Sequence, residues 1–214
     1  MSITLGIFTS FETRLRLEAF RDSCEVWPCH VVTNARLTTA VRFVKQHVVE
    51  APCDTKRHSP YVLGNMRYLL GYGLIQKRVY SDWVLLVDDD TRVFPQRSEF
   101  LRVLDPTRPV MMGDFAEKGH SSFACGGGGF LFSKASFATI DFSRCVDSEV
   151  CSAPPLSWMV DHMLARCLAK EQNITLLSSY GCGTCSNVWS PLYTIGQLTS
   201  GRCKFMHNQR SHSP

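Results

Sequence analysis

Three aspartates, Asp88, Asp89 and Asp90, directly follow an uninterrupted apolar run at Trp83–Val87. Such a run is typical of a strand that is covered on both faces in a parallel sheet. Ligands of these sheets bind beyond the carboxyl ends of the strands, so the aspartates stand where a crevice is expected. On an extended backbone Asp88 and Asp90 would share one side, about 6 to 7 Å apart, with Asp89 facing the other way.

Carboxylates in this pattern are suited to holding a divalent cation. Mg²⁺ and Mn²⁺ accept carboxylate oxygens and keep positions for the phosphate oxygens of a substrate. Three adjacent carboxylates also repel one another unless a cation or hydrogen-bond donors offset their charge. The simpler alternative is an acidic turn that only caps the next segment, with Thr91 as a turn residue. The buried strand ahead of the run favours the metal site.

A second candidate element is the run of four glycines at Gly126–Gly129, which leads into apolar Phe130–Phe132. Glycines permit positive φ values and a close approach of the backbone to a ligand. A flexible hinge fits less well, because flexible tracts usually mix Ser with Gly. The spacing of a GxxxxGK phosphate loop is absent.

Two further residues are chemical candidates nearer the C-terminus. Asp161 lies in the apolar segment 156–163 and is a candidate general base, because a carboxylate on an apolar surface is costly unless it is paired or used. An ion pair with Arg166 is the structural alternative. His207 is a candidate metal ligand, although a lone histidine is more often a packing or surface residue.

The elements that would position these residues alternate between strands and helices. Besides the strand before the aspartates, the hydrophobic spacing predicts strands at 3–8, 30–33, 47–50, 110–112 and 130–132. It predicts helices at 14–21, 35–46, 66–80, 99–104, 134–140 and 157–169. This alternation favours an α/β domain with a mostly parallel central sheet and right-handed crossovers.

The bulk composition favours one globular domain spanning residues 1–214, since the chain has 214 residues and is 44% hydrophobic. The part from 178 to 214 is rich in Cys and predicts irregular structure. The net charge of +4 comes without a block of five like charges, so nucleic acid is not the expected partner. A small positive excess suits a small anionic ligand.

The cysteine content bears on the cellular compartment. Ten cysteines form an even set that suits a disulfide framework, and Cys182 and Cys185 lack a second pair at zinc-site spacing. Asn173–Thr175 is a glycosylation triplet, which also indicates the secretory route. Ile3–Phe8 is too short for a signal core or a membrane span. Membrane attachment would therefore need an anchor absent from this chain, and a cytosolic protein is the alternative.

Trp83–Thr91, Gly126–Phe130 and Asp161, in this order and spacing, resemble the Fringe and beta-1,3-galactosyltransferase family, including its plant Fringe-like relatives. The resemblance covers residues 3–207. It implies a nucleotide-diphospho-sugar transferase fold of the GT-A type, a single Rossmann-like domain. It also implies an inverting, Mn²⁺- or Mg²⁺-dependent enzyme that moves a hexose or N-acetylhexosamine from a UDP-sugar to a hydroxyl of a glycan or glycoprotein acceptor. The expected location is the Golgi lumen or secretory pathway.

The resemblance also implies residue roles. Asp90 would bind the metal with His207, Asp88 would approach the donor ribose or a metal-bound water, and Asp161 would deprotonate the acceptor hydroxyl. Asn34 stands where the family usually has an aspartate, and its amide would hydrogen-bond the uracil or ribose without charge. The further positions implied in donor binding are Thr9, Arg14, Asp89, Gly127 and Gly128.

Two other classes of protein remain as alternatives. A phosphohydrolase of the haloacid dehalogenase type also places two aspartates after an apolar strand, one of them a nucleophile. That pattern expects the aspartates after the first strand and a threonine or valine where this chain has Arg92. The other alternative is a non-catalytic carbohydrate-binding module on the same fold.

Overall fold

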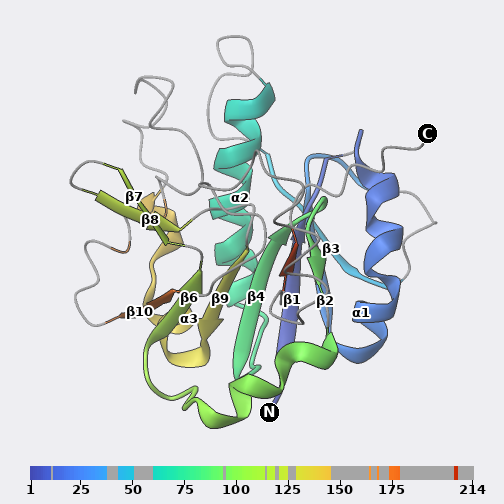
Figure 1. Cartoon of the computed structure of the whole chain (residues 1–214). Coiled ribbons are helices and arrows are strands. Elements are labelled where there is room, and N and C mark those ends of the chain that lie inside the picture. Colours follow the sequence, from blue (N-terminus) through green and yellow to red (C-terminus); the bar gives the residue numbers. More distant parts are fainter. Residues whose placement is uncertain are drawn as a thin grey trace.

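The central feature of the computed structural model is a seven-stranded sheet with the order β10-β6-β9-β4-β1-β2-β3 (Figure 1). The structure describes residues 1–10, 12–37, 43–50, 60–93, 95–113, 115–118, 121–124, 129–145, 174–178 and 205–206, with the single positions 164 and 168. The sheet consists of β1 (Ile3–Phe8), β2 (Cys29–Thr33), β3 (Lys45–Val48), β4 (Trp83–Asp88), β6 (Val110–Gly113), β9 (Phe130–Ser133) and β10 (Thr175–Ser178).

Six of these strands run in one direction. β1 pairs in parallel with both β2 and β4, β2 with β3, and β6 with β10. β9 runs antiparallel to both of its neighbours, β4 and β6. The predicted α/β fold with a mostly parallel sheet is therefore confirmed, and the reversed β9 is the one strand of the sheet that departs from it.

Helical segments cover both faces of the sheet. They are η1 (Arg14–Phe20), α1 (Arg21–Val26), α2 (Pro60–Gln76), η2 (Pro95–Val103), α3 (Lys134–Thr139) and η4 (Phe142–Cys145). Two small antiparallel pairs lie outside the main sheet: β7 (Phe115–Lys118) with β8 (Ser121–Ala124), and β5 (Arg92–Val93) with β11 (Phe205–Met206).

The apolar run of β4 contributes to a buried cluster on each face, which explains why it lacks polar alternation. Leu85 and Val87 belong to the cluster that includes Leu17 of η1. Val84 and Leu86 belong to the cluster that includes residues of α2, α3 and η4. Both clusters are almost fully shielded from solvent, so β4 is the buried centre of the fold.

The helix predicted at 35–46 is wrong in its described part. Residues 35–37 and 43–44 are not helical, and Lys45–Val48 forms β3, which pairs with β2 from His30↔Lys45 to Thr33↔Val48. The apolar residues in this stretch recur at helical intervals, but pairing with an already buried strand satisfies the backbone and buries His47. The strand predicted at 47–50 is correct in kind and begins two residues earlier.

The helix predicted at 66–80 is present with different bounds: α2 ends at Gln76 and begins at Pro60, a residue favoured in the first helical turn. Gly71 faces the sheet, where an added Cβ would lie 2.5 Å from Cγ1 of Val32. The missing side chain therefore lets α2 approach β2 closely. Gly73 has more room among the described residues, where the nearest atom to an added Cβ would be Cβ of Phe142, at 3.7 Å.

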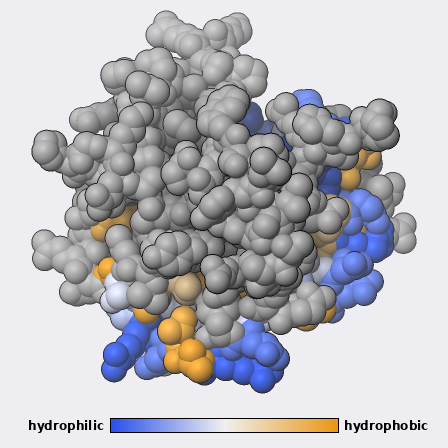
Figure 2. Space-filling view, in the orientation of Figure 1, coloured by the Kyte–Doolittle hydropathy of each residue, from blue (hydrophilic) through white to orange (hydrophobic). Residues whose placement is uncertain are grey.

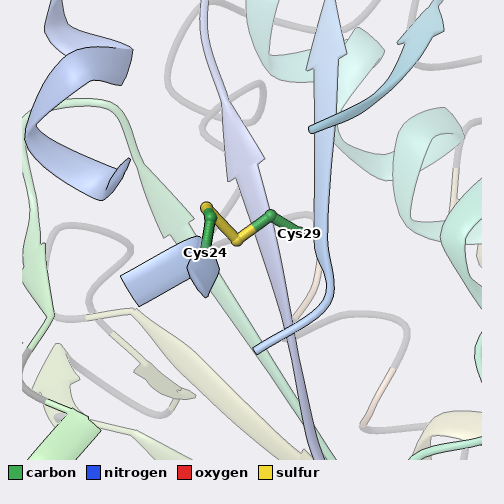
Figure 3. The surroundings of a disulfide bond; sticks show 2 residues. All are labelled: Cys24 and Cys29. Atoms are coloured by element: carbon green, nitrogen blue, oxygen red, sulfur yellow. A yellow bond between two sulfur atoms is a disulfide. The ribbon is translucent and has the colours of Figure 1, made fainter. Parts of the chain in front are cut away.

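One disulfide, Cys24–Cys29, joins α1 to the first residue of β2 (Figure 3). Cys145 at the end of η4 is disulfide-bonded as well. Among the described residues no cysteine is free, in keeping with the predicted disulfide framework. Cys182, Cys185 and the glycosylation site Asn173 lie outside the described residues.

The surface in the orientation of Figure 2 shows hydrophilic residues over α1, at the right, and along the lower edge around η2, where a small hydrophobic area interrupts them. In the described part of the chain, no helix has the length and apolarity needed to cross a membrane.

Candidate functional site

The site is built where the strand order changes direction. From β1 the chain continues to β2 and β3 on one side, and it then crosses over so that β4 lies on the other side of β1. Phe8 pairs with Asp88 at the last position of the two parallel strands. Thr9 and Asp89, which follow, therefore leave the sheet side by side, at the kind of switch point where α/β proteins bind ligands.

The acidic run forms a turn. The amide of Thr91 donates to the carbonyl oxygen of Asp88 at 3.1 Å, so Asp89 and Asp90 are the two central residues. The extended backbone expected across all three aspartates therefore ends at Asp88. Aspartate is favoured in turns because its short side chain bonds to nearby backbone groups. The acidic turn predicted as the simpler alternative is present, and it lies at the switch point, where a ligand is also expected.

Asp89 is buried, with 9% of its surface exposed, and both carboxylate oxygens accept hydrogen bonds from side chains. Its Oδ2 accepts from Oγ1 of Thr9 at 2.7 Å and also from Oγ1 of Thr13. Its Oδ1 accepts from Nη1 of Arg16 at 3.0 Å, which makes an ion pair. The structure thus brings together two predicted residues, Thr9 and Asp89, and adds two that the sequence did not single out.

The end of β2 meets the same loop. The carboxyl of Glu12 has a pKa below its usual range because of a hydrogen bond from its own backbone amide, helped by Ser10, Asn34 and the charge of Arg67. Asn34, a predicted donor-binding residue, is therefore next to the loop that follows β1. Arg67 comes from α2, and among the described residues its buried Nε has no hydrogen-bond partner. The predicted Arg14 lies nearby as the first residue of η1 and is half-buried.

The glycine run reaches the same edge through β9. Because Phe130 pairs with Leu86, Gly129 lies beside Val87, next to the acidic turn. Gly129 has a φ of +81°, and a Cβ would lie 3.1 Å from the carbonyl oxygen of Leu86. Both properties expected of these glycines, a positive φ and a close backbone approach, are found at Gly129. Gly127 and Gly128 lie outside the described residues.

This architecture matches solved glycosyltransferase structures. A glycosyltransferase involved in glycosylation of the major capsid of PBCV-1 aligns with 99% of this chain and 96% of its own, at a TM-score of 0.55 and 13% identity. The chain has the GT-A glycosyltransferase fold. The galactosyltransferase LgtC aligns at a TM-score of 0.57 and 13% identity, over 95% of this chain and 86% of its own. GlyE of Streptococcus pneumoniae TIGR4 aligns at 0.56 and 11% identity, over 97% and 54%.

These similarities establish the GT-A fold and do not distinguish the Fringe family within it. No protein-family profile matches the sequence, and no curated protein sequence matches it either.

Tyr68 of α2 lies near the acidic turn, and sequence reasoning did not single it out. Its ring packs edge-on against Phe8, with centroids 4.6 Å apart. Burial raises the pKa of its phenol well above the ordinary value, and the neighbouring carboxylate of Asp88 raises it further, followed by those of Asp89 and Asp90. The phenol is therefore neutral near the acidic turn. The only signal in the sequence is its helical spacing with Tyr72, which by itself indicates a core position.

The donor set at the acidic turn fits a hard divalent cation, because Asp88 and Asp90 offer carboxylate oxygens at the switch point of the GT-A sheet. Asp89 is already engaged by Thr9, Thr13 and Arg16. No cluster of three His, Cys, Asp or Glu side chains suited to a metal ion occurs within the described part of the chain.

Two predicted site residues, Asp161 and His207, lie outside the described residues. The strand just before His207 is described: β11 pairs antiparallel with β5, with Met206 opposite Arg92. Arg92 is two residues beyond Asp90. The chain that leads to His207 therefore passes next to the acidic turn.

Proposed function

We propose that this protein is an inverting glycosyltransferase that moves a hexose or N-acetylhexosamine from a UDP-sugar to a hydroxyl of a glycan or glycoprotein. The observation that carries the proposal is the acidic turn at the switch point of a GT-A fold, next to the loop after β1. That position suits a ligand whose nucleoside is bound by one loop and whose diphosphate is bound by the other. The Fringe-type resemblance supports the donor class.

Different residues of the site would bind different parts of the donor. Thr9, Arg14 and Asn34 would contact the nucleotide, and Asp90 with Asp88 would hold Mn²⁺ or Mg²⁺ near the diphosphate. When bound, the cation supplies positive charge that offsets the charge developing on the leaving diphosphate. Gly127 and Gly128 would bring the backbone close to the donor, as Gly129 already approaches Leu86.

The transfer step would need a base on the acceptor side. Asp161 would take the proton from the acceptor hydroxyl as its oxygen attacks the anomeric carbon, and the bond from that carbon to the diphosphate oxygen would break. UDP would leave with the electron pair, and Arg14 would offset part of its charge. The carboxylate of Asp161 alone would therefore supply the base that deprotonates the acceptor hydroxyl.

His207 as the C-terminal metal ligand is supported by the pairing of β11 with β5. Met206, the residue before His207 in the sequence, pairs with Arg92, which is two residues beyond Asp90. Imidazole is a suitable ligand for Mn²⁺ beside carboxylates.

We also propose that the protein works in the Golgi lumen or elsewhere in the secretory pathway. The supporting observation is that the described cysteines, Cys24, Cys29 and Cys145, are all in disulfides. Disulfides persist in oxidising compartments and are rare in the cytosol.

Release of UDP from a panel of UDP-sugars, measured with Mn²⁺, with Mg²⁺ and with EDTA, tests the proposed activity. We expect metal-dependent release from at least one UDP-hexose or UDP-N-acetylhexosamine, stimulated by a glycan acceptor. NMR of the product's anomeric proton then decides between inversion and retention. Metal-dependent binding of UDP with no transfer or hydrolysis of any donor would favour the non-catalytic carbohydrate-binding module.

The phosphohydrolase alternative has weaker support. Its aspartates are expected after the first strand, whereas β1 ends at Phe8 and the acidic turn follows β4. Release of phosphate from a generic phosphomonoester in the same assay would favour it.

A further inference from the structure

Asp89 is the buried aspartate of the acidic turn, and both oxygens of its carboxylate accept hydrogen bonds from the protein. The three side chains that donate to it are Thr9, Thr13 and Arg16, which lie in one short stretch from the end of β1 into η1. We call these three residues with Asp89 the Asp89 clamp. The contacts join parts of the chain that are 73 to 80 residues apart in sequence.

The side of the clamp formed by the loop is itself well ordered by hydrogen bonds. The amide of Ser10 donates to Oγ1 of Thr13 at 3.2 Å, and the amide of Thr13 donates to Oγ of Ser10 at 3.2 Å. The amide of Thr9 donates to the carbonyl oxygen of Val32 at 3.0 Å, which extends the pairing of β1 with β2. Asp89 therefore accepts hydrogen bonds from a loop that is also held by hydrogen bonds within itself.

A buried carboxylate needs such partners, since removing it from water is costly unless hydrogen bonds and an opposite charge compensate. Here two hydroxyls and one guanidinium do so. Arg16 is itself half-exposed, with 47% of its side chain accessible, so its charge is shared with solvent while Asp89 stays inside. The cation proposed for Asp88 and Asp90 is not needed to satisfy Asp89.

We propose that Asp89 is a positioning residue, which fixes the loop after β1 to the acidic turn and does not itself bind the metal or the nucleotide. This inference rests on the proposed function, in which the loop after β1 and the acidic turn bind two different parts of one donor molecule. A nucleoside held by one loop and a diphosphate held beside the other are covalently linked, so the distance between them is limited. The clamp sets the distance between the two parts of the site to match, and preorganisation of this kind strengthens binding.

The test compares Asp89→Asn, Arg16→Gln and the double variant in the full chain. Asp89→Asn keeps the size and one acceptor oxygen but loses the charge, and Arg16→Gln loses the same ion pair from the other side. The matched control is Arg21→Gln, which removes an ion pair with Glu18 that is exposed on both sides. Binding of UDP with Mn²⁺, binding of Mn²⁺ alone, and thermal unfolding are measured for each.

We expect each single change to weaken UDP binding in the presence of Mn²⁺ by about tenfold, and the double change to weaken it no further, because both break one interaction. Binding of Mn²⁺ alone should stay within about twofold of wild type. Arg21→Gln should behave as wild type. UDP binding is measured well below each variant's unfolding temperature, so a loss of stability alone would leave it unchanged.

Two results would overturn the inference. Loss of Mn²⁺ binding in Asp89→Asn but not in Arg16→Gln would make Asp89 a direct metal ligand. Additive losses of thermal stability would show that the two residues do not act as a pair. Thermal unfolding of the wild type, the two single variants and the double variant needs no nucleotide, so it tests the pairing of Asp89 with Arg16 in any case. If the wild-type protein binds no UDP, the proposed function is overturned instead.

Discussion

At the scale of single residues, the acidic run divides into two kinds of aspartate. Asp89 is buried and bonded to Thr9, Thr13 and Arg16, whereas Asp88 and Asp90 are only partly buried. The sequence predicted that Asp89 faces away from Asp88 and Asp90, but it did not predict the partners of Asp89, because a run of identical residues carries no information about partners far away in the chain. The donors to Asp89 lie 73 to 80 residues earlier, a relation that only the folded sheet creates.

Asp90 and Asp161 should separate donor binding from transfer. We expect Asp90→Asn to abolish Mn²⁺-dependent UDP binding, because the amide offers one weak ligand oxygen in place of a charged pair. Asp161→Asn should leave UDP binding intact and reduce transfer by about a hundredfold or more, as expected for loss of a general base. Calorimetry with UDP and steady-state transfer kinetics measure the two effects.

The control for both changes is Asp105→Asn. This exposed carboxylate accepts hydrogen bonds from Thr107 in the connection before β6 and should affect neither measurement. Equal loss of UDP binding in Asp90→Asn and Asp161→Asn would show that the base has been assigned to the wrong residue.

The buried histidine pair predicts how stability depends on pH. His30 and His47 stack with ring centroids 5.1 Å apart and share a contact of 2.8 Å between Nδ1 and Nε2. Burial, then His47, Lys45 and Arg78, lower the pKa of His30 from 6.5 to about 4. Burial and the charges of Arg78 and Lys45 lower the pKa of His47 as well.

Because the folded state prefers both rings neutral, their contribution to stability is complete above pH 6.5 and is lost as the pH falls toward 4. We expect the unfolding temperature to drop between about pH 7 and pH 5, and the drop to shrink in His47→Gln. An identical drop in wild type and His47→Gln would assign the pH dependence to other groups.

At the scale of elements, apolar pattern predicted most of the strands and helices that surround the site. β1 was predicted with its observed bounds, and β4 ends one residue later than expected, at Asp88. The helix expected at 35–46 failed because apolar residues at helical spacing suit a buried strand as well, and β2 offered a free edge for β3. The reversal of β9 was not foreseen, since a short apolar run does not reveal its direction.

Gly71 and Gly73 offer a matched pair of substitutions within α2. Gly71→Ala should destabilise the fold by about 1 to 3 kcal/mol, because the new methyl would overlap the side chain of Val32. Gly73→Ala should be neutral or stabilise by up to about 1 kcal/mol, because alanine favours the helix and its nearest neighbour among the described residues, Phe142, is at an ordinary contact distance. Urea unfolding of the two variants measures the difference, and equal effects would contradict the close contact of α2 with β2.

At the scale of the whole molecule, the disulfide and the site lie at opposite ends of β2. Cys29 begins the strand, and Asn34 follows its last residue. We expect the double change Cys24→Ala and Cys29→Ala to lower the free energy of unfolding by about 2 kcal/mol, as for a short closed loop. UDP binding well below the unfolding temperature should not change. Weaker UDP binding in this variant would show that the bond also supports the site.

Sequence reasoning predicted the fold class of the whole sheet but not the pairing of every strand. Alternating strands and helices indicated an α/β fold, and the resemblance to a transferase family indicated the GT-A type. The edge strand β10 and the pairing of β5 with β11 were missed, because four-residue and two-residue strands leave almost no pattern. Their partners are distant in the chain, and only tertiary packing selects them.

The two strands β5 and β11, which pair in the folded protein, are synthesised at different times. Residues 205–206 are made more than a hundred residues after Arg92 and Val93, and a ribosome adds about 5 to 20 residues each second. The acidic turn is therefore synthesised several seconds before the strand that comes to lie beside it. During that interval the nascent chain carries its aspartates without β11 paired to β5, so we expect metal binding that uses His207 to arise only after that residue has left the ribosome.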